Sequence, residues 1–84
     1  MSLVAKRSVS IRGHRTSISL EQAFFDELTL LAAGRNMPLA ALIAEIDGTR
    51  PQDANLSSAL RLYVLEQLKA RLKDGAWAAR AVRG

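Results

Sequence analysis

The chain has 84 residues, a formal net charge of +4, one histidine and no cysteine. A single domain of this length buries a smaller fraction of its surface than a larger domain does, so its core alone supplies little stability. The lack of cysteine excludes disulfides and thiolate metal ligands, and one histidine cannot build a metal site without carboxylates. We therefore expect oligomerisation to supplement the core, and we expect neither a metal nor another cofactor.

No apolar stretch approaches the roughly 20 residues that span a bilayer. The N-terminus also lacks the apolar region of a signal peptide. These two features predict a cytoplasmic protein without a membrane partner.

The charges are unevenly distributed along the sequence. Residues 1–20 hold four basic residues and no acidic one, 21–68 hold three basic and seven acidic residues, and 69–84 are basic again. A basic N-terminal segment on an acidic body is typical of proteins that bind a polyanion, usually nucleic acid. Surface arginines in this number also occur on proteins that bind no DNA, so charge alone does not decide.

Apolar and polar residues alternate over 8–20, which predicts a half-buried strand. The apolar residues fall on two parities, Val9 and Ile11 on one and Thr16, Ile18 and Leu20 on the other. One straight strand cannot bury both sets, so either Gly13 bulges the strand or Gly13-His14 turns a hairpin. We favour a main strand over 15–20, preceded by a basic arm over 1–14 whose structure the pattern does not define.

A helical period follows this strand. The apolar positions Phe24, Leu28 and Leu31 lie at i, i+4 and i+7. Ser19 is a candidate N-cap, and Gln22, three residues later, has the amide needed to complete a capping box. The segment Gly34-Arg35-Asn36 then ends the helix, because glycine and asparagine accept left-handed backbone angles.

A second helix begins near Pro38, whose fixed φ suits a first turn, and it stops at Asp47-Gly48. Its buried stripe holds Leu39, Leu42, Ile43 and Ile46. A loop covers 48–55, and Asn55 is the expected N-cap of a third helix over 56–74, followed by a tail over 75–84. The apolar face of this third helix holds Leu56, Leu60, Val64, Leu65, Leu68 and Leu72, and we expect it to dock on the core.

The predicted strand needs a partner for its edges. We find no second strand among the predicted helices, so the expected partner is the same strand of a second copy, which gives an antiparallel two-stranded ribbon. Arg15, Ser17 and Ser19 would face outward, and such a ribbon is narrow enough for the major groove of DNA. An ordinary solvent-facing strand has the same composition. The dimer core would hold Thr16, Ile18, Leu20, Phe24, Leu28, Leu31, Leu42, Ile43 and Ile46.

The segment RTSISLEQAFFDELTLLAAGRNMPLAALIAEI, at 15–46, resembles the ribbon-helix-helix superfamily of the Arc and methionine repressors. The stretches KRSVSIRGHRTSISL and LIAEID…NLSSALRLYVLE are similar to a family of short, stand-alone bacterial ribbon-helix-helix proteins. The resemblance covers about 6–68. It implies a mainly α fold with one short N-terminal strand, an intertwined homodimer over 15–47, and an extra C-terminal helix.

By position, the resemblance places the base contacts of the superfamily on Arg15, Ser17 and Ser19. It also implies that backbone N–H groups at the start of the second helix, here Leu39 and Ala40, hold a DNA phosphate. Pro38 departs from the usual pattern because it has no N–H to donate. Independently of the resemblance, we expect the basic arm to contact phosphate or the minor groove through Lys6, Arg7, Arg12 and His14. A solvated arm is the alternative.

These observations predict a sequence-specific DNA-binding protein, a transcriptional repressor that binds a short palindromic or tandem operator as a homodimer. The alternative is a protein-interaction module or an antitoxin, which would bind a partner protein with the third helix and the tail around Trp77. We find no Ser–His–acid set, no Gly-rich phosphate loop and no carboxylate pair in a pocket, so we expect no catalytic residue and no enzyme.

Overall fold

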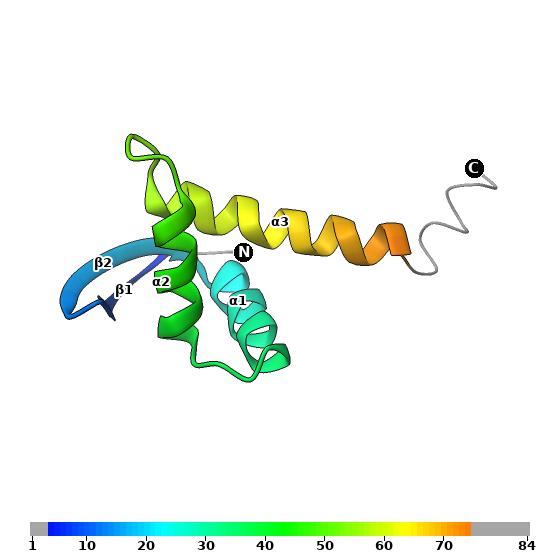
Figure 1. Ribbon diagram of the computed structural model, residues 1–84, viewed down its shortest axis with the longest axis horizontal. Coiled ribbons are helices and arrows are strands. Elements are labelled where there is room, and N and C mark those ends of the chain that lie inside the picture. The colour runs from blue at the N-terminus through cyan, green and yellow to red at the C-terminus, as the bar shows by residue number, and fades with distance from the viewer. Residues whose placement is uncertain (1–3, 75–84) are drawn as a thin grey trace.

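The computed structural model describes residues 4–74, which form a two-stranded sheet followed by three helices (Figure 1). The elements are β1 (Val4–Ile11), β2 (His14–Glu21), α1 (Gln22–Gly34), α2 (Leu39–Thr49) and α3 (Leu56–Asp74). α2 contacts β1, whereas α1 and α3 contact β2, so the three helices cover one face of the sheet. The predicted tail with Trp77 lies outside the described residues.

β1 and β2 form an antiparallel hairpin within the chain, in which Ile11 faces His14 and Val4 faces Glu21. The chain reverses at Arg12 and Gly13, whose φ angles are 49° and 82°. Positive φ at both central residues defines the type I′ turn, the two-residue turn whose twist matches that of the paired strands. The change of parity in the sequence therefore marks a hairpin turn. The two turn residues are Arg12 and Gly13, one residue earlier than the expected Gly13-His14.

The structure corrects two expectations about the N-terminal segment. Residues 4–11 form β1, where we expected an arm of undefined structure, and β2 extends over 14–21 rather than 15–20. Our inference that β2 has no partner in its own chain is wrong for this reason, because β1 occupies one of its edges. The homodimer itself stays a prediction.

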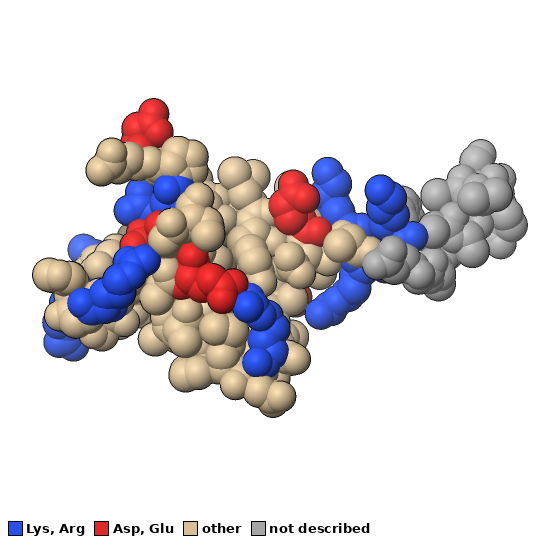
Figure 2. All heavy atoms as spheres, viewed as in Figure 1, with Lys and Arg blue, Asp and Glu red and all other residues tan. Residues whose placement is uncertain are grey.

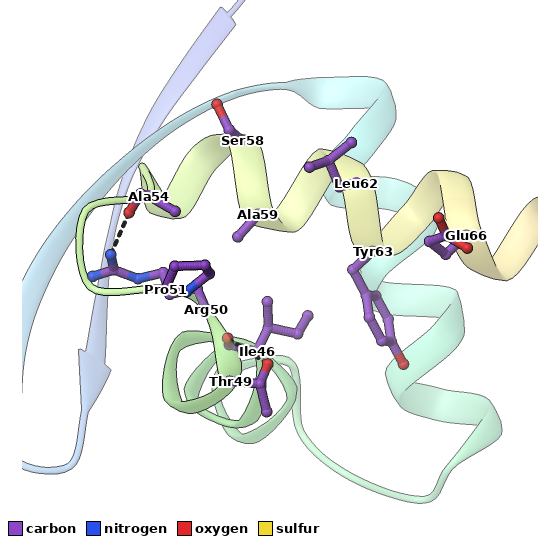
Figure 3. Close-up of a pocket in the computed structure, with 10 residues that line it drawn as sticks. All are labelled: Ile46, Thr49, Arg50, Pro51, Ala54, Ser58, Ala59, Leu62, Tyr63 and Glu66. Atoms are coloured by element: carbon purple, nitrogen blue, oxygen red, sulfur yellow. Dashed lines mark hydrogen bonds between the residues drawn. The ribbon is translucent and has the colours of Figure 1, made fainter.

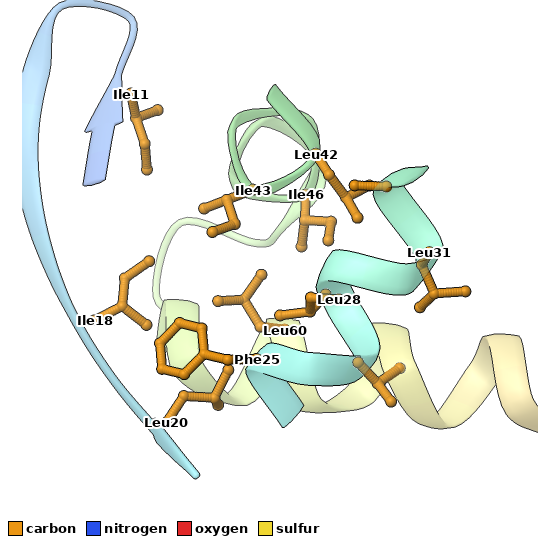
Figure 4. Close-up of a cluster of buried hydrophobic side chains, with 12 residues drawn as sticks. Ile11, Ile18, Leu20, Phe25, Leu28, Leu31, Leu42, Ile43, Ile46 and Leu60 are labelled. Atoms are coloured by element: carbon orange, nitrogen blue, oxygen red, sulfur yellow. The ribbon is translucent and has the colours of Figure 1, made fainter. Parts of the chain in front are cut away.

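The hydrophobic core lies between the hairpin and the three helices (Figure 4). Phe25 is 1 % exposed, whereas the predicted core residue Phe24 is half-buried at its margin. Both phenylalanines fit the helical period with Leu28, so periodicity did not identify the one that the sheet covers. Thr16 is also only half-buried. The other predicted core residues are buried as expected: Ile18, Leu20, Leu28, Leu31, Leu42, Ile43 and Ile46.

The helix boundaries are mostly as predicted. α1 ends at Gly34, with Asn36 at φ 57°, and the Asn55 side chain accepts a hydrogen bond from the Ser58 N–H at 3.2 Å. The N-cap of α1, however, is Glu21, and it makes no side-chain cap hydrogen bond. The predicted capping box at Ser19 is wrong because β2 continues through that residue.

α3 docks on its own chain through residues of its 56–68 portion. Leu60 and Val64 are buried, and Leu56 and Leu68 are half-buried against the core. Leu65 and Leu72 are 49 % and 46 % exposed, so their assignment to the docked face is wrong. For Leu72 the physical reason is visible in Figure 1, where the far end of α3 extends beyond the other helices. Leu65 lies before the half-buried Leu68 in the sequence, so it is exposed because it lies on the outer side of the helix with Leu62.

Replacing Gly13 with alanine should lower the free energy of unfolding by about 1–2 kcal/mol, because an L side chain is strained at positive φ. No atom lies within 4 Å of an added Cβ at Gly13, so the effect would come from the backbone alone. Gly34→Ala is the matched control, since its Cβ also meets nothing within 4 Å and no positive φ is found there. Denaturant unfolding measures both, and equal stabilities of the two variants would contradict the turn assignment.

Candidate nucleic-acid interface

The exposed residues of β2 form one row along the outside of the hairpin. Arg15, Ser17 and Ser19 are exposed, whereas Ile18, between the two serines, and Leu20, after Ser19, are buried. This alternation follows from the pleat of the strand, which directs successive side chains to opposite faces. The three residues predicted for base contacts therefore lie together on the side away from the helices, and their contact with DNA stays a prediction.

β1 adds a second row beside the first. Lys6 faces Ser19, Ser8 faces Ser17, and Ser10 faces Arg15 in the ladder, and the three β1 residues are all exposed. Facing residues in an antiparallel pair lie on the same side of the sheet. We call the six residues the outer face: Lys6, Ser8, Ser10, Arg15, Ser17 and Ser19. Sequence reasoning missed Ser8 and Ser10, although a turn centred on Arg12-Gly13 would have paired them with the β2 row.

The outer face has a composition that suits a polyanion. It holds two cations, four hydroxyl groups and no acidic residue. Glu21, at the end of β2, accepts a hydrogen bond from Arg61 of α3 at 3.0 Å, so its charge is paired. In Figure 2 basic residues gather over the hairpin and over the far end of α3, with acidic residues between them.

Arg15 differs from the other arginines of residues 4–68. Each of those others donates to a side chain elsewhere in the described part of the chain: Arg7 to Gln22, Arg12 and Arg50 to Asp47, Arg35 to Glu45, and Arg61 to Glu21. Arg15 makes no such hydrogen bond or ion pair within residues 4–74. An unpaired arginine on an exposed strand is available to a ligand without first losing a partner.

Arg7 and Arg12, both predicted phosphate contacts, are held by the protein itself. Arg7 faces Ile18 in the ladder, so it lies on the side of the hairpin opposite to the outer face. It donates to Gln22 Oε1 at 2.9 Å, and its guanidinium lies 4.7 Å from the ring centroid of Phe25. Arg12, in the turn, donates to Asp47 Oδ2 and to the Ala44 carbonyl, each at 3.3 Å. His14 is exposed beside the turn. The structure therefore separates these predicted arm residues from the outer face, while Lys6 belongs to it.

The start of α2 holds the predicted phosphate-binding N–H groups of Leu39 and Ala40. Pro38 is the N-cap, so its missing N–H lies just before the helix rather than within its first turn. The N–H groups of Ala41 and Leu42 both donate to the Pro38 carbonyl, at 3.0 and 3.2 Å. Leu39 and Ala40 donate to no other backbone group in the described chain. Since Arg12 contacts the opposite end of α2, these groups lie away from the hairpin turn.

Arg35 joins the turn after α1 to α2 and α3. Its guanidinium donates to both carboxylate oxygens of Glu45, at 2.7 and 2.9 Å, and to the Tyr63 hydroxyl at 3.3 Å. These hydrogen bonds from Arg35 hold the pKa of Glu45 below its ordinary value. They also raise the pKa of Arg35 above its ordinary value.

A largely apolar groove of ≈ 350 Å³ lies between the end of α2, the following loop and α3 (Figure 3). Ile46, Pro51 and Leu62 line it together with Tyr63.

Within residues 4–74 no group of three or more histidine, cysteine or acidic side chains could hold a metal. None of the helices within residues 4–74 combines the length and the apolarity that a membrane span requires.

Acid should weaken the attachment of α2 to α1 and α3. A carboxyl group whose pKa is lowered by folding stabilises the folded chain above its unfolded pKa, and this contribution disappears as pH falls through the folded value. Between about pH 5 and pH 3, the thermal midpoint of the wild type should therefore fall more steeply than that of Glu45→Gln. Glu66→Gln is the control for removing one exposed charge from a helix. Parallel curves for wild type and Glu45→Gln would contradict the Arg35–Glu45 contribution.

Comparison with protein families identifies a match to the ribbon-helix-helix domain over residues 4–68. No curated protein and no solved structure matches the chain. Proteins of the matched family generally bind DNA as transcription regulators, typically as dimers and without enzymatic activity. The match spans the hairpin, α1, α2 and most of α3, including every residue of the outer face. This chain belongs to the ribbon-helix-helix domain family.

Proposed function

We propose that this chain is a sequence-specific DNA-binding protein, a transcriptional repressor that reads the major groove with the outer face of its hairpin. The observation that carries the proposal is Arg15, which has no hydrogen-bond or ion-pair partner within residues 4–74 and lies in a row of small hydroxyl side chains on the side of the sheet away from the helices. Family membership supports DNA as the ligand.

The chemistry of the row fits base edges. Arginine donates two hydrogen bonds to O6 and N7 of guanine, and serine hydroxyls donate to or accept from several base edges. Ser17 and Ser19 are small, so the backbone of β2 can approach the floor of the groove. The hairpin is two strands wide, which is a width that the major groove admits.

Two copies would bind one operator in this proposal. The family typically binds DNA as dimers, and a small domain gains both stability and binding area by association. A palindromic or tandem operator then offers one half-site to each copy. Lys6 and His14 on the hairpin, and the N–H groups of Leu39 and Ala40, are the phosphate contacts that we propose.

Arg15→Ala should weaken binding to the selected operator by about 1–3 kcal/mol and relax the base preference at one position. Arg71→Ala is the matched control, because it removes one exposed arginine from the far end of α3. Binding-site enrichment followed by titration at several salt concentrations measures both effects. An unchanged preference at every base in Arg15→Ala would contradict its reading role, and no selected sequence for the wild type would contradict the function.

A partner-binding role is the second candidate, and the outside of α3 favours it. Leu62, Leu65 and Leu72 are 60 %, 49 % and 46 % exposed, and Leu62 also lines the apolar groove. Lys69, Arg71 and Lys73 follow on the same helix, so the fitting partner is a protein with an apolar strip beside acidic residues. A protein with this role alone would select no DNA sequence in the enrichment experiment. Its affinity for DNA would also not fall as the salt concentration rises.

A further inference from the structure

We propose that α3 carries an interface between copies of this chain, in which the exposed sides of two α3 helices pack antiparallel to each other. This pairing rests on the second candidate function, because it names another copy of the chain as the partner of the same surface. It involves neither the outer face nor DNA.

α3 has leucines on two sides. Leu60 and Leu68 lie against the core of their own chain, whereas Leu62, Leu65 and Leu72 are exposed. A helix on the surface of a domain normally has one apolar stripe, and a helix that is apolar on more sides is covered on more sides. The outward leucines of α3 therefore need a second packing partner.

The spacing of the exposed residues indicates the shape of that partner. Leu62, Leu65, Lys69 and Leu72 follow one another at steps of three, four and three residues, and all four are exposed. Alternating steps of three and four are the a and d positions of a heptad repeat, by which one helix packs along another. We call these four residues the outer seam. A second α3 has the same spacing, so the chain itself supplies a helix that fits.

Lys69 determines the direction of the pair. In a parallel pair equivalent residues face each other, so two lysines would meet inside the seam. In an antiparallel pair a twofold axis passes between Leu65 and Lys69, so Lys69 faces the partner's Leu65 and Leu62 faces the partner's Leu72. The lysine stem then covers a leucine while its ammonium stays in water.

The charges beside the outer seam also fit the antiparallel pair. Glu66 and Lys73 each follow a seam leucine directly, and neither forms an ion pair within residues 4–73. Helical side chains lean toward the N-terminus of their own helix. In the antiparallel pair Glu66 and the partner's Lys73 therefore lean toward each other, and the symmetry forms this contact twice.

The position of α3 on the body leaves room for a second copy. The far end of α3 extends beyond the other helices (Figure 1), so the body of the partner can lie beside it. Leu62 and Glu66 also line the apolar groove. The partner's Leu72 would therefore meet the edge of this groove, and the partner's Lys73 would meet its acidic residue.

Disulfide crosslinking of the full chain tests this pairing, because the chain has no cysteine of its own. Leu62→Cys and Leu72→Cys are prepared separately and then mixed without DNA in a glutathione buffer. The mixture should give at least about 10-fold more disulfide-linked pairs than either variant alone, because positions 62 and 72 come within disulfide reach only between antiparallel helices. Leu30→Cys mixed with Leu72→Cys is the matched control, since Leu30 is an exposed leucine on α1.

Two substitutions of Leu65, each added to both cysteine variants, test the register. Leu65→Lys sets a lysine against the partner's Lys69 and should lower the crosslinked fraction about 10-fold or more. Leu65→Glu sets a carboxylate against the same lysine and should lower the fraction less. Circular dichroism establishes that each variant is folded.

Three results would overturn the pairing. They are crosslinking of each cysteine variant with itself alone, a mixture that crosslinks no more than the Leu30→Cys control, and equal losses for Leu65→Lys and Leu65→Glu. Each of these leaves the DNA-binding proposal standing, because the enrichment experiment tests that proposal separately. A wild type that selects no DNA sequence, conversely, would end the DNA-binding proposal and leave the crosslinking result unchanged.

Discussion

The rest of the structure depends on the turn at Arg12 and Gly13, where two successive residues take positive φ. Glycine adopts this conformation without strain, but for an arginine it costs about 1–2 kcal/mol. The guanidinium of Arg12 donates to Asp47 and to the Ala44 carbonyl of α2, each at 3.3 Å. Gly48 permits that approach, since a Cβ there would lie 2.8 Å from Arg12 Nη2. The turn thus closes the hairpin and attaches it to the second helix.

Closing the hairpin divides the N-terminal segment into two chemically different faces. The inner face brings Ile11, Ile18 and Leu20 against Phe25 and the helices, and the burial of these side chains fixes the register. A shift of one residue would place the hydroxyl row in the core and the isoleucines in solvent. The same register therefore determines both the stability of the domain and the arrangement of the outer face.

Much of this arrangement could be predicted from the sequence. The Gly34 and Asn55 helix boundaries and the alternation in β2 follow from local rules, as does most of the core. The sequence left the partner of β2 open between a bulge and a hairpin, because Arg-Gly is an unusual pair for a type I′ turn, which favours Asn-Gly. The pairing of Arg61 with Glu21, 40 residues apart, depends on the docking of α3, which no local pattern encodes. The exposure of Leu72 has the same origin, since periodicity does not show where a helix leaves the body.

The central claim is that the hairpin forms within one chain and that its outer face is the surface that we propose for DNA. The most direct measurement is NMR on an equal mixture of isotope-labelled and unlabelled chains. The account predicts close contacts between the Hα atoms of Ser8 and Ser17, which face each other in the ladder, within single labelled chains, both free and on DNA. It also predicts new contacts from the β-protons of both serines to the bases. Contacts between β1 and β2 that join labelled to unlabelled chains would contradict it.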